Sequence, residues 1–112
     1  MVADDPLVSE KFGGLRKGLL EFVLLIVVSA NRVYVADILS RLAQTPFATQ
    51  EGTLYPLLSK LRREELVDYE WVESEAGPPR KYYSLTDKGS ARLADLSAYW
   101  ANLNHTLEEL GR

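Results

Sequence analysis

A chain of 112 residues has room for one domain with a substantial core, but not for two. Its composition, 46% apolar and 26% charged, is that of an ordinary globular protein, and the absence of cysteine excludes disulfides and thiolate metal sites. The formal charge of −3 counts against nucleic-acid binding, unless the cations gather on one surface and the acids elsewhere.

The N-terminal residues 1–14 show little periodicity, begin with acids and contain the Gly13-Gly14 break. We therefore expect a flexible arm. The segment has neither the cationic start nor the apolar core of a signal peptide, so we expect a cytoplasmic protein.

The first predicted helix begins at Leu15, and its stretch from Leu19 to Val28 is apolar except for Glu21. This stretch is far shorter than the roughly 20 residues that span a bilayer, so we expect no membrane insertion. A helix that is apolar all round must be buried on more than one side. One face can pack on the same domain: Leu20, Val23, Leu24 and Val27. The other apolar side chains need a further surface: Leu15, Leu19, Phe22 and Ile26. We expect a second subunit to supply that surface.

Two more helices are expected before the middle of the chain. After the break at Asn31-Arg32, the core spacing returns in a second helix that ends near Ala43. In the third helix, four leucines recur at i, i+3, i+4 and i+7 and therefore share one inward face: Leu54, Leu57, Leu58 and Leu61.

The start of this third helix is ambiguous because of Pro56. If Thr49 is the N-cap, Pro56 lies inside the helix and the Gly52 carbonyl loses its hydrogen bond. If the helix begins near Thr53, the proline falls in the first turn, where no donor is missed. The sequence leaves both starts open.

After Arg63 the apolar period becomes alternating, which predicts a half-buried strand with Val67, Tyr69 and Trp71 on one side. A second strand is expected over residues 80–85. The Gly-Pro-Pro segment between them cannot form a ladder, so we expect residues 75–79 to make an exposed hairpin tip. A helix able to enter a groove, followed by a hairpin with a cationic edge, is typical of a winged helix-turn-helix, here residues 15–86.

The last predicted helix follows Thr86, a plausible N-cap, with Asp87 placed against the helix dipole. Its apolar residues alternate in steps of three and four, which is the pattern of an a/d seam: Leu93, Leu96, Trp100, Leu103, Leu107 and Leu110. We expect residues 87–112 to be a dimerisation helix. The predicted fold class is thus mainly α with a small β-hairpin (α+β), and the predicted assembly is a homodimer.

Two separated motifs carry a resemblance to a known family. The run EGTLYPLLSKLRREELV, followed by GPPRKYYSLTDKG, resembles the PadR family of bacterial transcriptional regulators, whose members carry a Gly-Thr-Leu-Tyr-Pro recognition helix and an Arg-Lys-Tyr-Tyr wing strand. The resemblance covers roughly residues 15 to 110, about one domain in length. It implies a DNA-binding repressor that recognises a double-stranded operator.

The exposed face of the third helix supplies the expected DNA contacts. Residues near its N-terminus would approach base edges in the major groove: Thr49, Gln50, Thr53 and Pro56. Residues further along, or on its flanks, would hold phosphates: Tyr55, Ser59, Lys60 and Arg63. Arg80 and Lys81, paired cations at the hairpin tip, suit the minor groove or its phosphates, although one of them could instead pair with Glu73 or Glu75.

Trp100 is the residue on which ligand sensing would depend. In a small branch of the PadR family, a tryptophan at the matching point of the last helix faces its symmetry mate across the dimer and sandwiches planar, drug-like compounds. The position of Trp100 on the seam is similar. By the same resemblance, four other residues would line the pore: Gly18, Leu19, Phe22 and Asn104. The alternative is that Trp100 is simply dimer core.

Enzymatic and metal-binding functions are disfavoured. The chain has no cysteine nucleophile, no phosphate-cradling glycine loop and a single histidine, His105, so we expect no catalytic residue, no metal site and no cofactor. The remaining alternative function is a winged-helix module that binds another protein through its acidic surface and apolar first helix.

Overall fold

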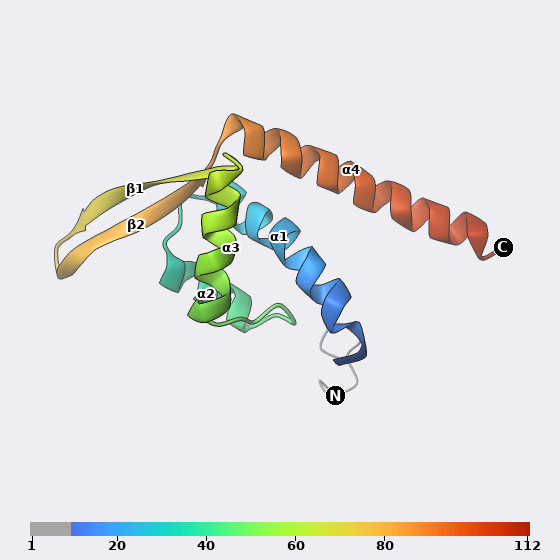
Figure 1. Cartoon of the computed structure of the whole chain (residues 1–112), viewed down its shortest axis with the longest axis horizontal. Helices are drawn as coiled ribbons and strands as arrows, with labels where there is room; N and C mark the ends of the chain where they lie inside the picture. Colours follow the sequence, from blue (N-terminus) through green and yellow to red (C-terminus); the bar gives the residue numbers. More distant parts are fainter. Residues whose placement is uncertain (1–9) are drawn as a thin grey trace.

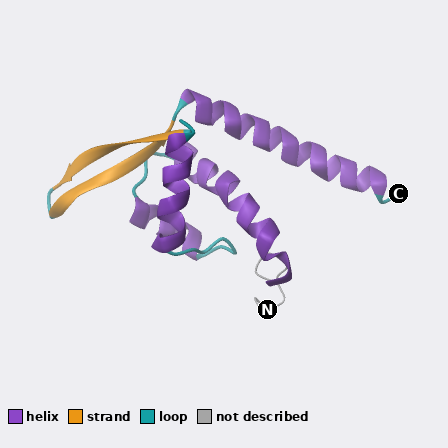
Figure 2. Cartoon of the chain, viewed as in Figure 1, coloured by secondary structure: helices purple, strands orange, loops and turns teal. Residues whose placement is uncertain are grey.

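The computed structural model describes residues 10–112. A 3₁₀ turn, η3 (Glu10–Phe12), leads into four helices, α1 (Gly13–Ala30), α2 (Val35–Ala43), α3 (Glu51–Arg63) and α4 (Asp87–Leu110). Between α3 and α4, strands β1 (Val67–Ser74) and β2 (Gly77–Leu85) form an antiparallel hairpin (Figures 1 and 2). The predicted α+β fold class is confirmed. The first helix begins slightly earlier than predicted, so residues 10–14 of the expected arm are helical, and the rest of that arm lies outside the described residues.

One hydrophobic core joins α1, α2, α3 and the base of the hairpin. From α3 it takes Leu54, Leu58 and Leu61, each fully buried, with Leu57 partly buried beside them. The predicted leucine face of α3 is therefore confirmed. Each such leucine, removed from water, contributes about 1.5 to 3 kcal/mol to the hydrophobic driving force. The core thus fixes the rotation of α3 and determines which of its side chains face solvent.

The apolar residues of α1 divide almost as predicted. Its core face is Leu20, Leu24, Leu25 and Val28, with Val23 and Val27 partly buried. Leu25 and Val28 were not expected in this face. Leu15 and Ile26 are exposed, as expected for the side chains that need another surface.

The hairpin differs from the prediction at its tip. Pairing continues to Ser74 and Gly77, so Pro78 and Pro79 lie within β2 rather than in a loop. The register is irregular between Val72 and Ser74, which leaves the two prolines where the ladder is already interrupted and their missing donors cost little. At its base, the hairpin is tied to the segment before α2 by two backbone hydrogen bonds between Val33 and Tyr83, of 3.0 and 2.7 Å.

The tight turn that leads from α3 into β1 lies directly against the start of α4. Leu66 N–H donates to the Leu61 carbonyl and Glu65 N–H to the Arg62 carbonyl, each at 2.9 Å, which is a Schellman C-cap. Thr86 donates its hydroxyl to the Glu65 carbonyl at 2.6 Å and accepts from Gly89 N–H at 2.9 Å. The prediction of Thr86 as the N-cap of α4 is confirmed, and α4 starts directly against the C-terminus of α3.

Thr49 is not the N-cap of α3. The N-cap is Gln50, whose carbonyl accepts hydrogen bonds from the N–H groups of Thr53 and Leu54, both at 3.0 Å. The helix therefore begins one residue later than a Thr49 cap would place it. The Gln50 side chain makes no cap hydrogen bond. Pro56 consequently lies inside the helix, which agrees with the first of the two predicted starts in all but the capping residue.

Two parts extend away from this body (Figure 1). The hairpin projects on one side and α4 on the other, which gives principal dimensions of 57 × 34 × 20 Å. The second half of α4 presents large apolar side chains to solvent: Tyr99, Trp100, Leu107 and Leu110. In the described part of the chain, no helix is both long enough and apolar enough to cross a membrane.

Candidate nucleic-acid interface

The exposed line of α3 is built from small residues and one arginine. Opposite its buried leucines lie Gly52, Pro56, Ser59 and Arg63, all exposed. A Cβ on Gly52 would meet nothing within 4 Å. Small side chains along the middle of an exposed helix let a flat or grooved partner approach its backbone closely.

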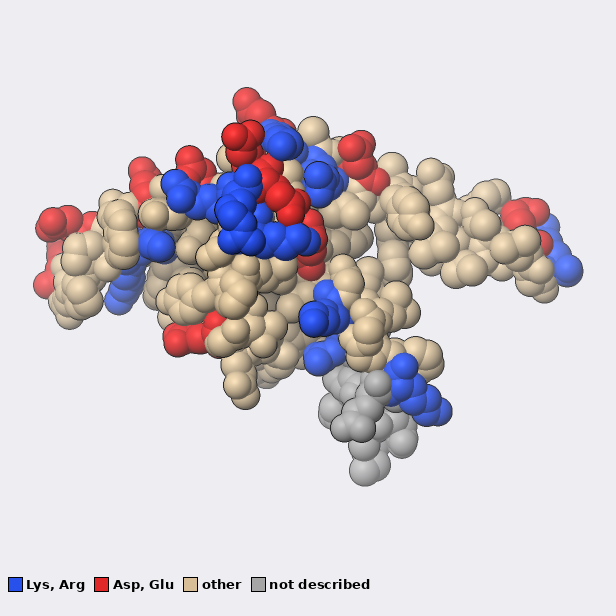
Figure 3. Space-filling view, in the orientation of Figure 1, with Lys and Arg blue, Asp and Glu red and all other residues tan. Residues whose placement is uncertain are grey.

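One flank of α3 faces the hairpin across a hollow of about 400 Å³. Side chains of both elements line it, among them Ser59, Asp68 and Tyr69. Three of the lining side chains are cationic: Arg62, Arg63 and Lys81. Figure 3 shows blue atoms over the upper part of α3 and again along the hairpin, with red atoms beside them in both places. Two acids, Glu65 and Asp68, line the same hollow, so its three cations leave an excess of one positive charge there, although the whole chain is acidic.

Arg62 is held in place by the hairpin. Its Nε lies 3.2 Å from Asp68 Oδ1, and its guanidinium carbon lies 4.4 Å from the centre of the Tyr69 ring. The backbone N–H of Tyr69, and secondly Arg62, lower the pKa of the exposed Asp68 carboxyl, so it stays ionised. Because Asp68 uses only the inner nitrogen of Arg62, the two terminal nitrogens can serve another acceptor.

Sequence reasoning did not select Arg62 as a site residue. The signal was present, since Arg62 belongs to a run of cations at the end of α3. The helical period alone placed it on a flank, however, and only the hairpin makes that flank part of the interface.

Arg80 and Lys81 are not paired cations at a tip. They stand opposite Val72 and Trp71 in the register, and consecutive strand residues point to opposite faces. Lys81 Nζ lies 4.3 Å from the centre of the Tyr69 ring, on the side toward α3.

Arg80 and its neighbours form a second cationic surface on the other hairpin face. The Arg80 guanidinium stacks 4.7 Å above Tyr34, whose ring meets Tyr82 edge-on at 5.2 Å. Arg32 lies over Tyr82 and pairs with Glu70. The sequence does not predict three of these residues as site residues: Arg32, Tyr34 and Tyr82. Their local spacing does not indicate that the segment before α2 packs against the hairpin. Both hairpin cations contact aromatic rings rather than Glu73 or Glu75, so the alternative pairing with those acids is not what the structure contains.

Lys60 faces away from the hairpin, toward α1. Its Nζ lies 3.2 Å from Glu21 and 3.8 Å from Glu64, so its charge is engaged within the protein. Thr53 and Pro56 line a second, separate hollow, which lies between α1 and α3. The predicted DNA contacts of α3 are therefore divided: Tyr55, Ser59 and Arg63 are directed to the hairpin side or to open solvent, whereas Thr53 and Lys60 border α1. Of the two residues before the helix, Gln50 is exposed and Thr49 is half-buried.

The predicted ligand residues lie on two diverging helices. Gly18, Leu19 and Phe22 are on α1, and Trp100 and Asn104 are on the part of α4 that runs away from the body (Figure 1). Trp100 is 42% exposed, and Gly18 and Asn104 are exposed as well. A site that enclosed a ligand between these residues would need a further wall beyond those of a single chain.

Comparison with known proteins relates this arrangement to one group. A family model described as "Transcriptional regulator PadR-like family" matches residues 23–95, which is most of the chain. A PadR-like transcription factor from Bacteroides fragilis is similar at 42% identity and a TM-score of 0.79, with 91% of this chain and 99% of that chain covered. A PadR family regulator from Eggerthella lenta is 31% identical, with a TM-score of 0.81 and coverages of 98% and 96%. An uncharacterized protein from Lysinibacillus sphaericus is 26% identical over 82% of this chain and 87% of its own length.

Proposed function

Because the chain belongs to the PadR-like family of transcriptional regulators, which are not enzymes, we propose that it binds operator DNA as a homodimer and represses transcription. One observation carries the DNA-binding part of this proposal. Cations from α3 and from the hairpin line the same hollow, beside an exposed helix face of small residues.

In the proposed complex, α3 lies in the major groove with Gln50, Pro56 and Ser59 toward the base edges. The phosphate backbone runs through the hollow between α3 and the hairpin, where Arg62, Arg63 and Lys81 neutralise it. The hairpin then reaches the adjacent minor groove, with Arg80 on its outer face.

The proposed dimer is formed by α1 and α4. Its support is the apolar surface that a single chain leaves in water, above all the second half of α4. Monomeric proteins rarely expose contiguous apolar surface of this kind. A dimer would present two copies of α3 to the same side of a duplex, about 34 Å apart, which is one turn of DNA.

Salt dependence tests the phosphate contacts. Each phosphate contact that is lost should lower the slope of log K against log salt concentration by about 1. Arg63→Gln and Lys81→Gln should each do so, while Arg112→Gln, an equal loss of charge at the end of α4, should leave the slope unchanged. If both interface variants keep the wild-type slope on a duplex that the protein binds specifically, the proposed track of phosphates is wrong.

We further propose that a planar ligand between the two copies releases the DNA, with Trp100 as its stacking platform and Gly18, Leu19, Phe22 and Asn104 around it. Titration of the protein with a flat cationic dye tests this, with tryptophan fluorescence as the readout. Quenching should disappear in Trp100→Ala, and the dye should weaken DNA binding by the wild type. Quenching that persists in Trp100→Ala would come from Trp71, the other tryptophan, and would contradict this site.

A further inference from the structure

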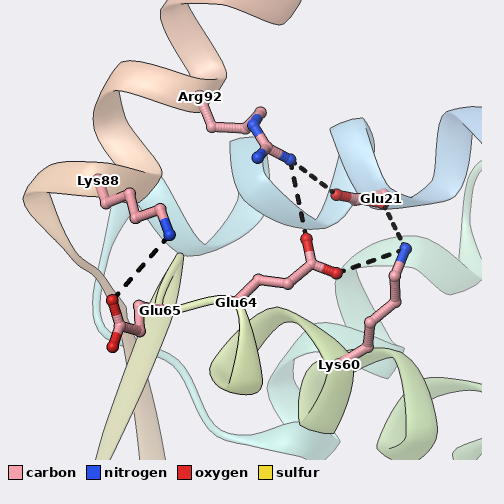
Figure 4. Close-up of polar contacts among 6 residues, drawn as sticks. All are labelled: Glu21, Lys60, Glu64, Glu65, Lys88 and Arg92. Carbon is pink, nitrogen blue, oxygen red and sulfur yellow. Dashed lines mark hydrogen bonds and ion pairs between the residues drawn. The ribbon is translucent and has the colours of Figure 1, made fainter.

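Four charged side chains form a closed ring where α1, α3 and α4 meet (Figure 4). Glu21 comes from α1, Lys60 from α3, Glu64 from the C-cap of α3 and Arg92 from α4. Lys60 Nζ lies 3.2 Å from Glu21 and 3.8 Å from Glu64, and Arg92 Nη1 lies 3.7 Å and 3.8 Å from the same two carboxylates. Each cation therefore faces two acids, and each acid faces two cations.

The ring is more than a set of isolated surface pairs. Exposed single pairs contribute little, but a network of alternating charges is the exception. The Glu21 side chain is only 23% exposed, and the other three range from 36% to 49%. The pair between Lys60 and Glu64 lies within the end of α3. The other three pairs join different helices, so they oppose movement of α1, α3 and α4 relative to one another.

The ring sits one turn beyond the point where α4 is attached. Thr86 and Gly89 fix the first turn of α4 against Glu65 and Leu66. Past this attachment, Leu93 and Leu96 pack partly on the core, and the rest of α4 projects outward (Figure 1). Arg92 is thus placed where an ion pair can fix the direction in which α4 leaves the domain.

Small rotations of α4 have large effects at its far end. A 24-residue helix is about 36 Å long at 1.5 Å per residue. A rotation of roughly 5.5° at its attachment displaces the far end by about 3.5 Å, close to the rise of one base pair. In a dimer held together by α4, the same rotation changes the separation of the two α3 helices.

We propose that Arg92 is a positioning residue that sets the half-site spacing which the dimer accepts, by holding α4 at a fixed angle to α3. This inference rests on the proposed function, since it requires a dimer that binds an inverted repeat. It assigns to Arg92 no contact with DNA. It also explains why the half-exposed Lys60 side chain is directed toward α1, although it lies on α3: Lys60 completes the ring.

Selection from a random duplex library tests the inference and the proposed function separately. Wild type, Arg92→Gln and Lys88→Gln are each used to select binding sequences, which are then compared in half-site and in spacer length. Lys88 is the matched control, because it lies on α4 one turn earlier and, among residues 10–112, pairs only with Glu65, at 4.0 Å and outside the ring (Figure 4). Thermal unfolding of each variant confirms that it is folded.

The wild type and Lys88→Gln should select inverted repeats of one spacing. Arg92→Gln should select the same half-sites, but with several spacings. Its preference for the best spacer over a spacer one base pair longer or shorter should fall about fivefold, which corresponds to about 1 kcal/mol. Arg92→Lys should restore most of the preference. Selection of a single spacing by Arg92→Gln would overturn the inference and leave the proposed function standing. Failure of the wild type to select any repeat would overturn both.

Discussion

Gly89 shows how strongly a single position can be constrained by packing. A Cβ built there would lie 1.9 Å from the Leu66 carbonyl oxygen and 2.9 Å from a methyl group of Leu85. The backbone of Leu66 cannot yield easily, because its N–H and carbonyl both hold hydrogen bonds in the turn that joins α3 to β1 and α4. Only glycine allows α4 to begin this close to α3.

Gly89→Ala should therefore destabilise the protein by about 3 kcal/mol, the upper end of the usual cost of overpacking. The sign is opposite to that of an ordinary helix, where alanine is favoured over glycine by up to about 1 kcal/mol. Gly14→Ala is the control, because nothing lies within 4 Å of its added methyl group. Urea unfolding at one protein concentration measures both. Equal stability of Gly89→Ala and wild type would contradict the packing described here.

Glu65 carries the only positive φ among the described non-glycine residues, 63°. It occupies the position of the Schellman cap where glycine is usual, since a Cβ is strained in the left-handed region. Its side chain contributes one distant pair with Lys88.

Replacing Glu65 by glycine or by alanine separates backbone strain from that pair. Both variants lose the side chain, but only Glu65→Gly relieves the strain, so it should be more stable than Glu65→Ala by about 1 kcal/mol. Chemical denaturation of the two variants gives the difference directly. An alanine variant as stable as the glycine variant would show that the cap carries no strain.

At the same scale, the sequence predicts correctly which side chains of α3 face solvent, although their contacts with DNA stay a prediction. Ser59 and Arg63 could be found, because their spacing from the buried leucines decides that they face outward. Lys60 was selected by the same period, but a residue of α1, 39 positions away, takes up its charge. The sequence does not predict Arg62 as a site residue for the same reason: Tyr69 and Asp68, which hold its side chain in place, lie on the hairpin. Contacts between residues distant in the chain are not encoded in local spacing.

At the level of elements, the helices and the hairpin followed from period and turn chemistry. The leucine face of α3 was predictable, because four apolar residues on one side of a helix must be buried. The length of β2 was not predictable, because prolines normally exclude a ladder, whereas this ladder has an irregular step between Val72 and Ser74, opposite the two prolines. The first turn of α3 begins one residue later than a Thr49 cap would place it. The Gln50 carbonyl, rather than the Thr49 hydroxyl, accepts the hydrogen bonds that close this turn.

The second half of α4 carries the exposed apolar side chains on which the proposed dimer depends. Leu107 is 57% exposed in the single chain, so Leu107→Gln should cost a protomer less than about 0.5 kcal/mol. In the proposed dimer, the same change removes a buried apolar contact and should weaken association at least about tenfold. Sedimentation equilibrium over a range of concentrations measures this, with Glu108→Gln, off the seam, as control. An unchanged dissociation constant would exclude Leu107 from the interface.

For the molecule as a whole, the acidic net charge and the cationic hollow are compatible. Long-range repulsion between an acidic protein and DNA limits nonspecific binding, while local cations act at short distance where screening is weak. A single copy offers few phosphate contacts. In the proposed dimer, two copies linked at a fixed separation would bind with an effective local concentration that a monomer cannot reach.

In the proposed complex, two chains bind one duplex together. Sedimentation velocity of the protein, mixed with a duplex that it has selected, tests this most directly, because the mass of the complex gives its stoichiometry. We predict a single complex of two chains with one duplex, and its loss when one half-site is scrambled. A complex of one chain with one duplex, or protein and DNA that sediment independently, would contradict the account.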